Sequence, residues 1–165
     1  MDNESQKGAV NMLAHLKIMS TLDIFCNMNT TRIAEFADLT KTKIAEELSE
    51  LSEAGIIAES TKSTDKMKYW ELTEKGTELL KFYSDILTID FRIRVDTLRT
   101  DKKEKCIQIL SALEKSEKSR TELSNELGIV NKELDLFLVF LEKTNQIQID
   151  VVNETLCYKL KEREN

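Results

Sequence analysis

The sequence predicts a mainly helical α+β protein in which small β-hairpins accompany the helices. The chain has 165 residues with no proline and only four glycines, which leaves few sharp turns and favours helices over a sandwich or barrel. Apolar residues recur at helical spacing along most of the sequence, and an alternating pattern is confined to short stretches. With about 150 residues per domain as a guide, the length allows one domain or two small ones.

Three helices are predicted in the first part of the chain. Apolar positions recur at helical spacing over residues 9–25. A short second helix starts at Thr30 or Thr31, whose hydroxyl can cap it, and Thr40 can cap a third helix over residues 41–54.

A hairpin is predicted to follow the third helix. Gly55 stands where the helix end needs a left-handed residue. Residues 56–59 and 67–72 are predicted strands, and the polar stretch 60–66 is the turn between them. Residues 73–76 end the second strand and begin another helix.

This order of helix, short helix, helix and hairpin resembles prokaryotic, especially archaeal-type, winged helix-turn-helix regulators of the MarR/ArsR/PadR kind. The most specific segments are Leu51-Ser52-Glu53-Ala54-Gly55-Ile56-Ile57 and Tyr69-Trp70-Glu71-Leu72-Thr73-Glu74-Lys75-Gly76. The resemblance covers residues 9–84. It implies a winged-helix domain that binds DNA and a regulator that works by binding alone.

A second, degenerate winged helix is predicted over residues 101–160. The expected elements are three helices followed by two strands: 102–115 capped by Asp101, 119–128, 132–143 capped by Asn131, 146–152 and 155–160. The fold class is therefore tandem winged helix-turn-helix domains, with small hairpin wings, joined by a long connector.

The connector, residues 77–100, carries an apolar seam with steps of three and four residues, which is typical of a coiled coil. The seam predicts a helical connector that contributes to a dimer, through Phe82, Ile86, Ile89 and Ile93. Residues 88–96 also alternate like a strand, and the helix is the favoured interpretation.

Composition excludes several classes of protein. With 24 Lys+Arg against 30 Asp+Glu, the formal net charge is −6, which argues against a general nucleic-acid coat protein or a basic membrane-surface protein. No apolar run approaches the ~18 residues that span a bilayer, and the acidic N-terminus lacks a signal-peptide core. We expect a cytoplasmic protein with no membrane contact.

Catalytic and metal chemistry have little support in the sequence. The cysteines Cys26, Cys106 and Cys157 are widely spaced, and His15 is the single histidine. A disulfide framework or a zinc site within one chain is therefore not expected, and His15 is interpreted as structural. No phosphate-binding loop or nucleophile motif is present. We expect no enzyme and no cofactor.

The candidate DNA contacts follow from the winged-helix resemblance. The third helix of such a domain enters the major groove, and Lys and Arg are common partners of bases and phosphates. The expected contacts are Arg32, Lys41, Thr42 and Lys43 on the helices, and Lys62, Lys66 and Lys68 on the wing. Glu46 and Glu47 come next on the same helix, and acidic side chains repel phosphates.

The second domain differs, because residues 134–141 hold more apolar side chains than one face of a surface helix can bury. This predicts a protein interface that includes Phe137 and Phe140. The resemblance therefore implies a homodimeric transcriptional regulator that binds double-stranded DNA, with a protein partner possible through the second domain. The alternative function is a tandem winged-helix assembly subunit, as in chromosome condensation or the small ESCRT-II subunit, that binds proteins and no DNA.

Overall fold

Helices provide most of the secondary structure, as the composition predicts. The computed structural model describes residues 3–87, 93–152 and 154–161, with the side chains of the first helix described from Asn11 onward. The chain divides into two units, Met1–Ile93 and Arg94–Asn165, here called unit 1 and unit 2.

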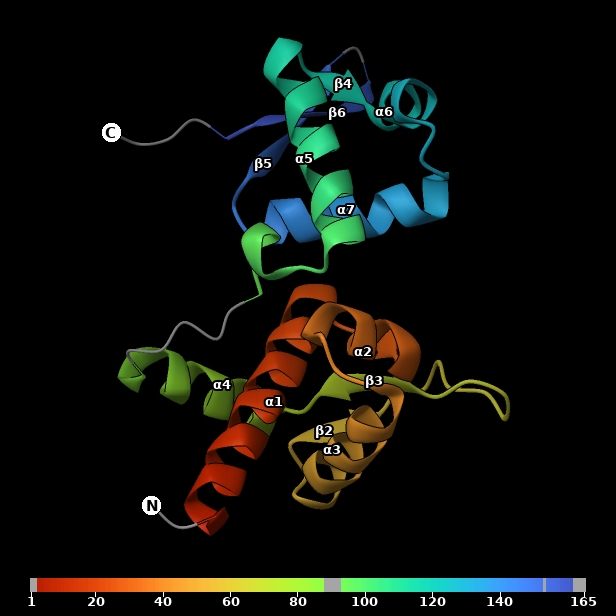
Figure 1. Cartoon of the computed structure of the whole chain (residues 1–165). Helices are drawn as coiled ribbons and strands as arrows, with labels where there is room; N and C mark the ends of the chain where they lie inside the picture. The colour runs from red at the N-terminus through yellow and green to blue at the C-terminus, as the bar shows by residue number, and fades with distance from the viewer. Residues whose placement is uncertain (1–2, 88–92, 153, 162–165) are drawn as a thin grey trace. The chain divides into compact units, whose positions relative to one another are not determined.

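Unit 1 is a winged helix (Figure 1). Strand β3 is the centre of a small antiparallel sheet of order β1-β3-β2, with Met28 opposite Trp70 and Ile57 opposite Leu72. Helices α2 and α3 form the helix-turn-helix, and the β2–β3 hairpin is the wing. Its elements run in the order α1 (Asn3–Phe25), β1 (Met28–Asn29), α2 (Thr30–Ala37), α3 (Lys41–Glu53), β2 (Ile57–Glu59), β3 (Tyr69–Leu72) and α4 (Glu74–Ile86).

Short polar contacts set the ends of these helices. The hydroxyl of Thr40 accepts a hydrogen bond from the backbone N–H of Lys43, as predicted. The predicted threonine cap of α2 is wrong, because Asn29 takes that place and its Oδ1 accepts from the N–H of Arg32 at 3.0 Å. Thr30 is already the first helical residue, and its hydroxyl instead accepts from the indole N–H of Trp70.

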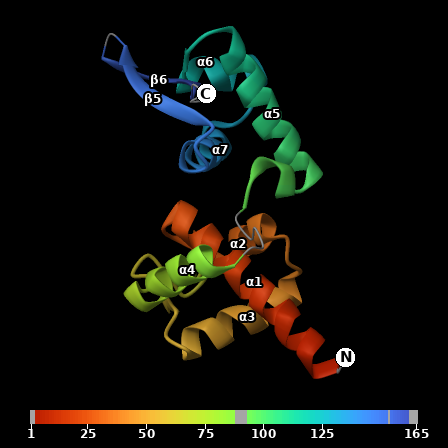
Figure 2. The ribbon, with the colours of Figure 1, turned by 90° about the vertical axis from the view of Figure 1, so that its left-hand side faces the viewer.

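Gly76, in the first turn of α4, packs closely against the backbone of Ile56. A Cβ atom at Gly76 would lie 2.1 Å from the backbone oxygen of Ile56, so no larger residue fits without moving the backbone. Thr73 caps the same helix by accepting from the N–H of Gly76, and its hydroxyl also bonds the Gly55 carbonyl. Helix α4 then lies against α1, as Figures 1 and 2 both show.

Unit 2 repeats the order of unit 1 from α1 to β3, and its sheet has the matching order β4-β6-β5. The 3-10 helix η1 precedes this series, and no described helix follows it as α4 does in unit 1. A constant shift of 90 residues relates the bounds of β1 and β4, α2 and α6, and α3 and α7. The elements are the 3-10 helix η1 (Val95–Thr97), α5 (Thr100–Lys115), β4 (Lys118–Ser119), α6 (Arg120–Leu127), α7 (Asn131–Lys143), β5 (Ile147–Val152) and β6 (Thr155–Leu160).

The predicted caps of unit 2 are also corrected. Helix α5 begins at Thr100, so Asp101 lies inside its first turn, and the preceding Arg99 makes no side-chain cap. Asn131 is the first residue of α7 and does not cap it, since Val130 precedes the helix.

The prediction of one helix through the connector is wrong. Helix α4 ends at Ile86, where Leu87 is already extended, and the next described helical turn is η1. Residues 88–92 lie outside the described residues, so the choice between helix and strand there cannot be compared with the structure. Ile93 is buried, and its N–H approaches the hydroxyl of Ser20 on α1. It is therefore part of the core of unit 1 and not of an interface.

Each unit has its own apolar core. In unit 1 the largest fully buried apolar side chains come from α1, α2, α3 and β2: Ile18, Met19, Leu22, Ile33, Ile44, Leu51 and Ile57. In unit 2 they come from α5, α6 and α7: Ile109, Leu123, Leu134, Phe140 and Leu141. Among the described residues, no helix combines the length and the apolarity that crossing a membrane requires.

Candidate nucleic-acid interface

The turn between α2 and α3 fixes where α3 begins. Asp38 adopts a left-handed backbone (φ 54°), and the N–H of Leu39 donates to the carbonyl of Ala34 at 2.9 Å. Ile44, Leu48 and Leu51 then point into the core. The outer face of α3 is left with small and charged residues: Lys41, Thr42, Ala45, Glu46, Ser49, Glu50 and Glu53.

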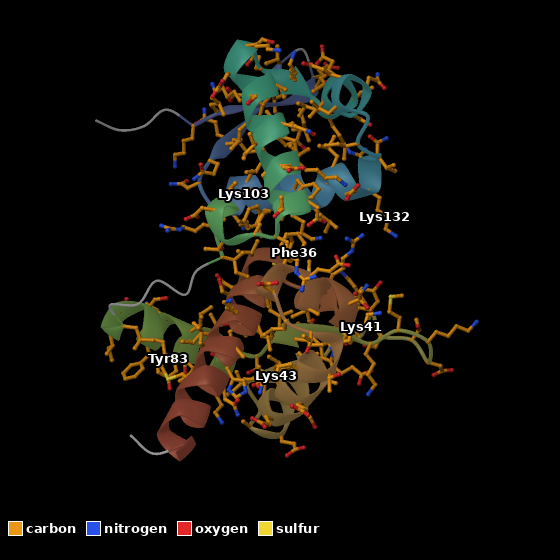
Figure 3. The ribbon with its side chains drawn as sticks, in the orientation of Figure 1. Phe36, Lys41, Lys43, Tyr83, Lys103 and Lys132 are labelled. Atoms are coloured by element: carbon orange, nitrogen blue, oxygen red, sulfur yellow. The ribbon has the colours of Figure 1, made fainter. Side chains whose placement is uncertain are left out.

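Lys41 and Thr42 are exposed at the start of α3, as a base-reading position requires. Lys43 points elsewhere. Its ammonium contacts a carboxylate oxygen of Glu47 and donates to Oδ1 of Asn11 on α1 at 2.9 Å. Figure 3 labels Lys41 on the side of the wing and Lys43 on the side of α1. The expected DNA contact through Lys43 therefore does not fit its side chain.

The electrostatics around Lys43 agree with this placement. The hydrogen bond to Glu47 raises the pKa of Lys43, and the charges of Glu46, Glu47 and Glu50 act in the same direction, while partial burial lowers it. Lys43 therefore stays protonated and offsets the charge of Glu47.

The wing carries three lysines in different situations. The N–H of Ser60 donates to the carbonyl of Tyr69 at 2.8 Å and keeps the hairpin closed near its base. Lys62 and Lys66 are exposed and form no ion pair with any residue that the structure describes. Lys68 pairs with Glu59 at 3.1 Å and lies 5.9 Å from the centre of the Trp70 ring.

Arg32 is committed within its own helix. One guanidinium nitrogen lies 3.1 Å from Oε2 of Glu35, and the side chain is only partly exposed. It remains near the surface at the start of α2, where a backbone phosphate contact needs the arginine to exchange this partner.

The corresponding helix of unit 2 has a different surface. Arg120 at the start of α6 binds both carboxylate oxygens of Asp135 on α7, at 2.5 and 2.6 Å. That hydrogen-bonded pair raises the pKa of Arg120. Lys132 is exposed at the start of α7. The face that would enter a groove is thus partly engaged in an internal ion pair.

The predicted partner surface on α7 is wrong, because Phe137 and Phe140 are 2% and 0% exposed. The other helices of unit 2 cover them, so a helix that looked too apolar for a surface is a core helix. Exposed apolar side chains lie elsewhere. On α4, Phe82 and Ile86 are 57% and 58% exposed. On the β5–β6 hairpin, Val151 and Leu156 are paired across the strands and are 70% and 55% exposed. Ile89 lies outside the described residues.

One cluster of side chains is not predicted by the sequence. His15 on α1 meets Glu47 and Glu50 on α3, with Nε2 at 2.5 Å from Oε2 of Glu47 and 3.4 Å from Oε2 of Glu50. The three-residue spacing of Glu47 and Glu50 places both on one helix face. This spacing is the feature of the sequence that points to the cluster. Their meeting with His15 is a tertiary contact between elements far apart in sequence.

The cysteines do not point to a reactive site. Cys106 is buried in unit 2, and burial raises the pKa of its thiol to about 12, so it is not a thiolate at neutral pH. Burial, followed by nearby acidic charges, also raises the pKa of Cys157. Cys26 is exposed at the end of α1.

No family model and no curated protein matches the chain. Among solved structures, a MarR family transcriptional regulator from Silicibacter pomeroyi is 22% identical, covers 62% of this chain and 69% of its own, and gives a TM-score of 0.44. The zinc-responsive MarR family member ZitR of Lactococcus lactis is 20% identical over 62% of this chain and 73% of its own, with a TM-score of 0.37.

The DIP2311 protein of Corynebacterium diphtheriae is 16% identical and matches 87% of this chain but 26% of its own, with a TM-score of 0.33. All three TM-scores lie below 0.5. The winged-helix fold of unit 1 is therefore described from its own elements alone.

Proposed function

We propose that unit 1 binds double-stranded DNA and that the protein is a transcriptional regulator that acts by binding alone. The observation that carries this proposal is the arrangement of exposed cations on the two elements by which a winged helix approaches DNA. Lys41 and Thr42 begin α3, and Lys62 and Lys66 lie on the wing. The ammonium groups of Lys41, Lys62 and Lys66 have no ion-pair partner among the described residues and remain available for phosphates.

The later turns of α3 shape how such a complex forms. Glu46, Glu50 and Glu53 are exposed on the same helix, so phosphates are repelled from its C-terminal half. DNA contact is therefore concentrated on the first turn of α3 and on the wing. A carboxylate in the major groove accepts a hydrogen bond only from a base amino group, N4 of cytosine or N6 of adenine, which adds to sequence selection.

We propose further that unit 2 is a second winged helix in tandem and that the protein is a homodimer. The repeated order helix, strand, two helices and two strands, with the same sheet order, supports the first statement. The exposed apolar pairs Phe82 with Ile86, and Val151 with Leu156, are the surfaces available to a second copy. A dimer would read two half-sites about one helical turn apart.

The test is fluorescence anisotropy with pooled genomic duplex fragments over a series of salt concentrations. For the wild type we expect enrichment of one fragment and binding that weakens with salt by about one log-log slope unit per phosphate contact. The double variant Lys41→Glu/Lys66→Glu should weaken binding and reduce the slope by about two units. Lys81→Glu, a single charge reversal on exposed α4, is the control and should bind as the wild type.

One result would overturn this placement, and a second would extend it. Unchanged affinity of the Lys41→Glu/Lys66→Glu protein would remove the first turn of α3 and the wing from the interface. An equal loss in Lys132→Glu, at the start of α7, would assign DNA contact to unit 2 as well.

A second candidate function, protein assembly without DNA, is favoured by the apolar face of the β5–β6 hairpin. Ile149, Val151 and Leu156 expose apolar surface on this hairpin, and β5 is an edge strand of its sheet. Absence of duplex binding at low salt by the folded protein would favour it. Analytical ultracentrifugation then compares the oligomeric state of Val151→Asp/Leu156→Asp with that of the wild type. An unchanged oligomeric state would exclude the hairpin as the contact between two copies.

A further inference from the structure

The cluster of His15, Glu47 and Glu50 joins two helices of unit 1. One ligand atom from each residue, the imidazole nitrogen Nε2 and two carboxylate oxygens, lies within 4.8 Å of the other two. The residues come from the middle of α1 and from two successive turns of α3. One imidazole and two carboxylates are a donor set that suits zinc and similar divalent ions.

The second observation is the state of Glu47. Its side chain is completely buried, at 0% exposure. Neither Oε2 of Glu47 nor Nε2 of His15 makes a hydrogen bond of acceptable geometry with a described residue, although these two atoms are 2.5 Å apart. Lys43 contacts the other oxygen, Oε1. Lys43 pairs with one oxygen only, and a buried polar atom left without a hydrogen bond is costly. An ion bound by both Nε2 and Oε2 would satisfy these atoms. Two ligands of one zinc-class ion stand about 3.3 Å apart, so the partly exposed His15 ring would move outward from its 2.5 Å contact.

Unit 2 shows that the fold itself does not need this arrangement. The shift of 90 residues places Lys105, Glu133, Phe137 and Phe140 where unit 1 has His15, Lys43, Glu47 and Glu50. There a single ion pair joins Lys105 to Glu133 at 2.6 Å, and Phe137 and Phe140 fill the space beneath. The same helices thus pack with aromatic residues in one unit and around a carboxylate in the other.

We propose that His15, Glu47 and Glu50 bind one divalent transition-metal ion of the zinc class. The three side chains supply three ligands. Glu50 is 55% exposed and His15 is partly exposed, so a fourth position faces solvent and suits water. Lys43, held by Asn11, stays beside the outer oxygen of Glu47 and limits the net negative charge of the site. This proposal revises the sequence-based expectation that His15 is structural and that no metal is bound.

A consequence follows for α3, and this consequence alone rests on the proposed DNA binding. The ion would link α1 to α3 and offset the charges of Glu47 and Glu50 on the helix assigned to the major groove. We therefore expect the metal-loaded protein to bind duplex DNA more tightly than the metal-free protein at the same salt concentration. Metal binding itself is measured without DNA, so failure of the proposed function would not be mistaken for failure of the site.

The experiment uses the untagged 165-residue chain after treatment with a chelator. Co²⁺ is titrated and followed by its visible absorption, and Zn²⁺ is titrated while the ring signals of His15 are followed by NMR. His15 is the only histidine, so these signals report one residue. We expect one ion per chain and a shift of the ring resonances on binding.

Variants assign the ligands. His15→Gln and Glu50→Gln should each weaken Zn²⁺ binding by at least about tenfold. Two matched controls should leave it unchanged: Glu46→Gln, on the exposed face of α3, and Glu133→Gln, in unit 2. Both ligand variants change exposed or partly exposed side chains, and the fluorescence of Trp70 confirms that unit 1 is folded.

Three outcomes would overturn the proposal. The first is the absence of Co²⁺ or Zn²⁺ binding by the wild type. The second is binding by Glu50→Gln and His15→Gln that equals the wild type. The third is a Co²⁺ spectrum with thiolate charge-transfer bands, which would place the ion on cysteines.

Discussion

Glu47 and Phe137 occupy equivalent positions on the third helices of the two units, and both are buried. Phe137 completes an apolar core, and Lys105 caps it by pairing with Glu133 at the surface. Glu47 instead places a carboxylate under α1, beside Lys43 and His15. The contact between the first and third helices of a unit can therefore be packed either with aromatic rings or with charged side chains. Aromatic residues there serve stability, and the charged set in unit 1 is better explained by binding.

The surfaces of α3 and α7 differ in the same sense. The first turn of α3 presents Lys41 and Thr42 without internal partners among the described residues. On α7, Asp135 is held by both guanidinium contacts of Arg120. The hairpins differ too, since β2–β3 exposes lysines and β5–β6 exposes apolar side chains. Unit 1 thus exposes cations on α3 and its hairpin, and unit 2 exposes apolar side chains on its hairpin.

The largest expected effect comes from the aromatic core of unit 2. Phe140→Ala should destabilise that unit by about 3–5 kcal/mol, because it deletes a fully buried ring and leaves a cavity. The only tryptophan, Trp70, lies in unit 1. In urea we expect the far-UV circular dichroism transition to acquire an early phase while the Trp70 fluorescence transition stays in place. Coincident shifts of both signals would show that the two units unfold together.

Gly76→Ala should act on unit 1 alone. The added Cβ meets the Ile56 carbonyl oxygen, so the start of α4 must move away from β2. Overpacking of this kind destabilises by about 1–3 kcal/mol. The midpoint of the Trp70 fluorescence transition should fall, and Glu78→Ala, on the exposed side of α4, serves as the control. An unchanged midpoint would mean that α4 is not rigidly docked.

The residues that follow the third helices of the two units can be exchanged by mutation. Gly55 and Asn145 hold equivalent left-handed positions, with φ of 69° and 65°. Gly55→Val should lower the free energy of unfolding by about 1–2 kcal/mol, because a β-branched residue is strained at positive φ. Gly55→Asn, which uses the residue of unit 2, should cost less than half of that. Equal effects in the urea midpoint would contradict the shared backbone state.

The smallest effect is a difference in acid sensitivity between α2 and α6. The Ser119 hydroxyl, and then its backbone N–H, hydrogen-bond to Glu122 and lower the pKa of that carboxyl. Because the folded pKa is the lower one, this stabilisation is present above the unfolded pKa of about 4.3 and is lost as the pH falls through the folded value.

Asn29 caps α2 with Arg32 at the equivalent position, and no such carboxylate is involved. Amide hydrogen exchange at the start of α6 should therefore accelerate on acidification more than at the start of α2, after correction for intrinsic rates. The Glu122→Gln variant should remove this difference. If α2 and α6 respond alike in the wild type, the capping box of α6 has no role in acid sensitivity.

Local signals in the sequence predicted much of unit 1. Thr40, Gly55 and the segment ending in Gly76 act over a few residues, through a cap, a left-handed end and a close backbone approach, so their patterns are readable along the chain. The errors concern longer range. Phe137 and Phe140 were expected on a surface because an apolar helix is equally compatible with an interface and with a core.

The sequence by itself determined the mainly helical composition, the winged-helix order of unit 1 and the exposed lysines of α3 and the wing, because periodicity and turn chemistry are local. Only the tertiary structure decided that α4 ends at Ile86 and that Lys43 turns to α1. It also decided that His15 meets Glu47 and Glu50. Those outcomes depend on which helices pack together, and the burial that packing imposes is not encoded in any one segment.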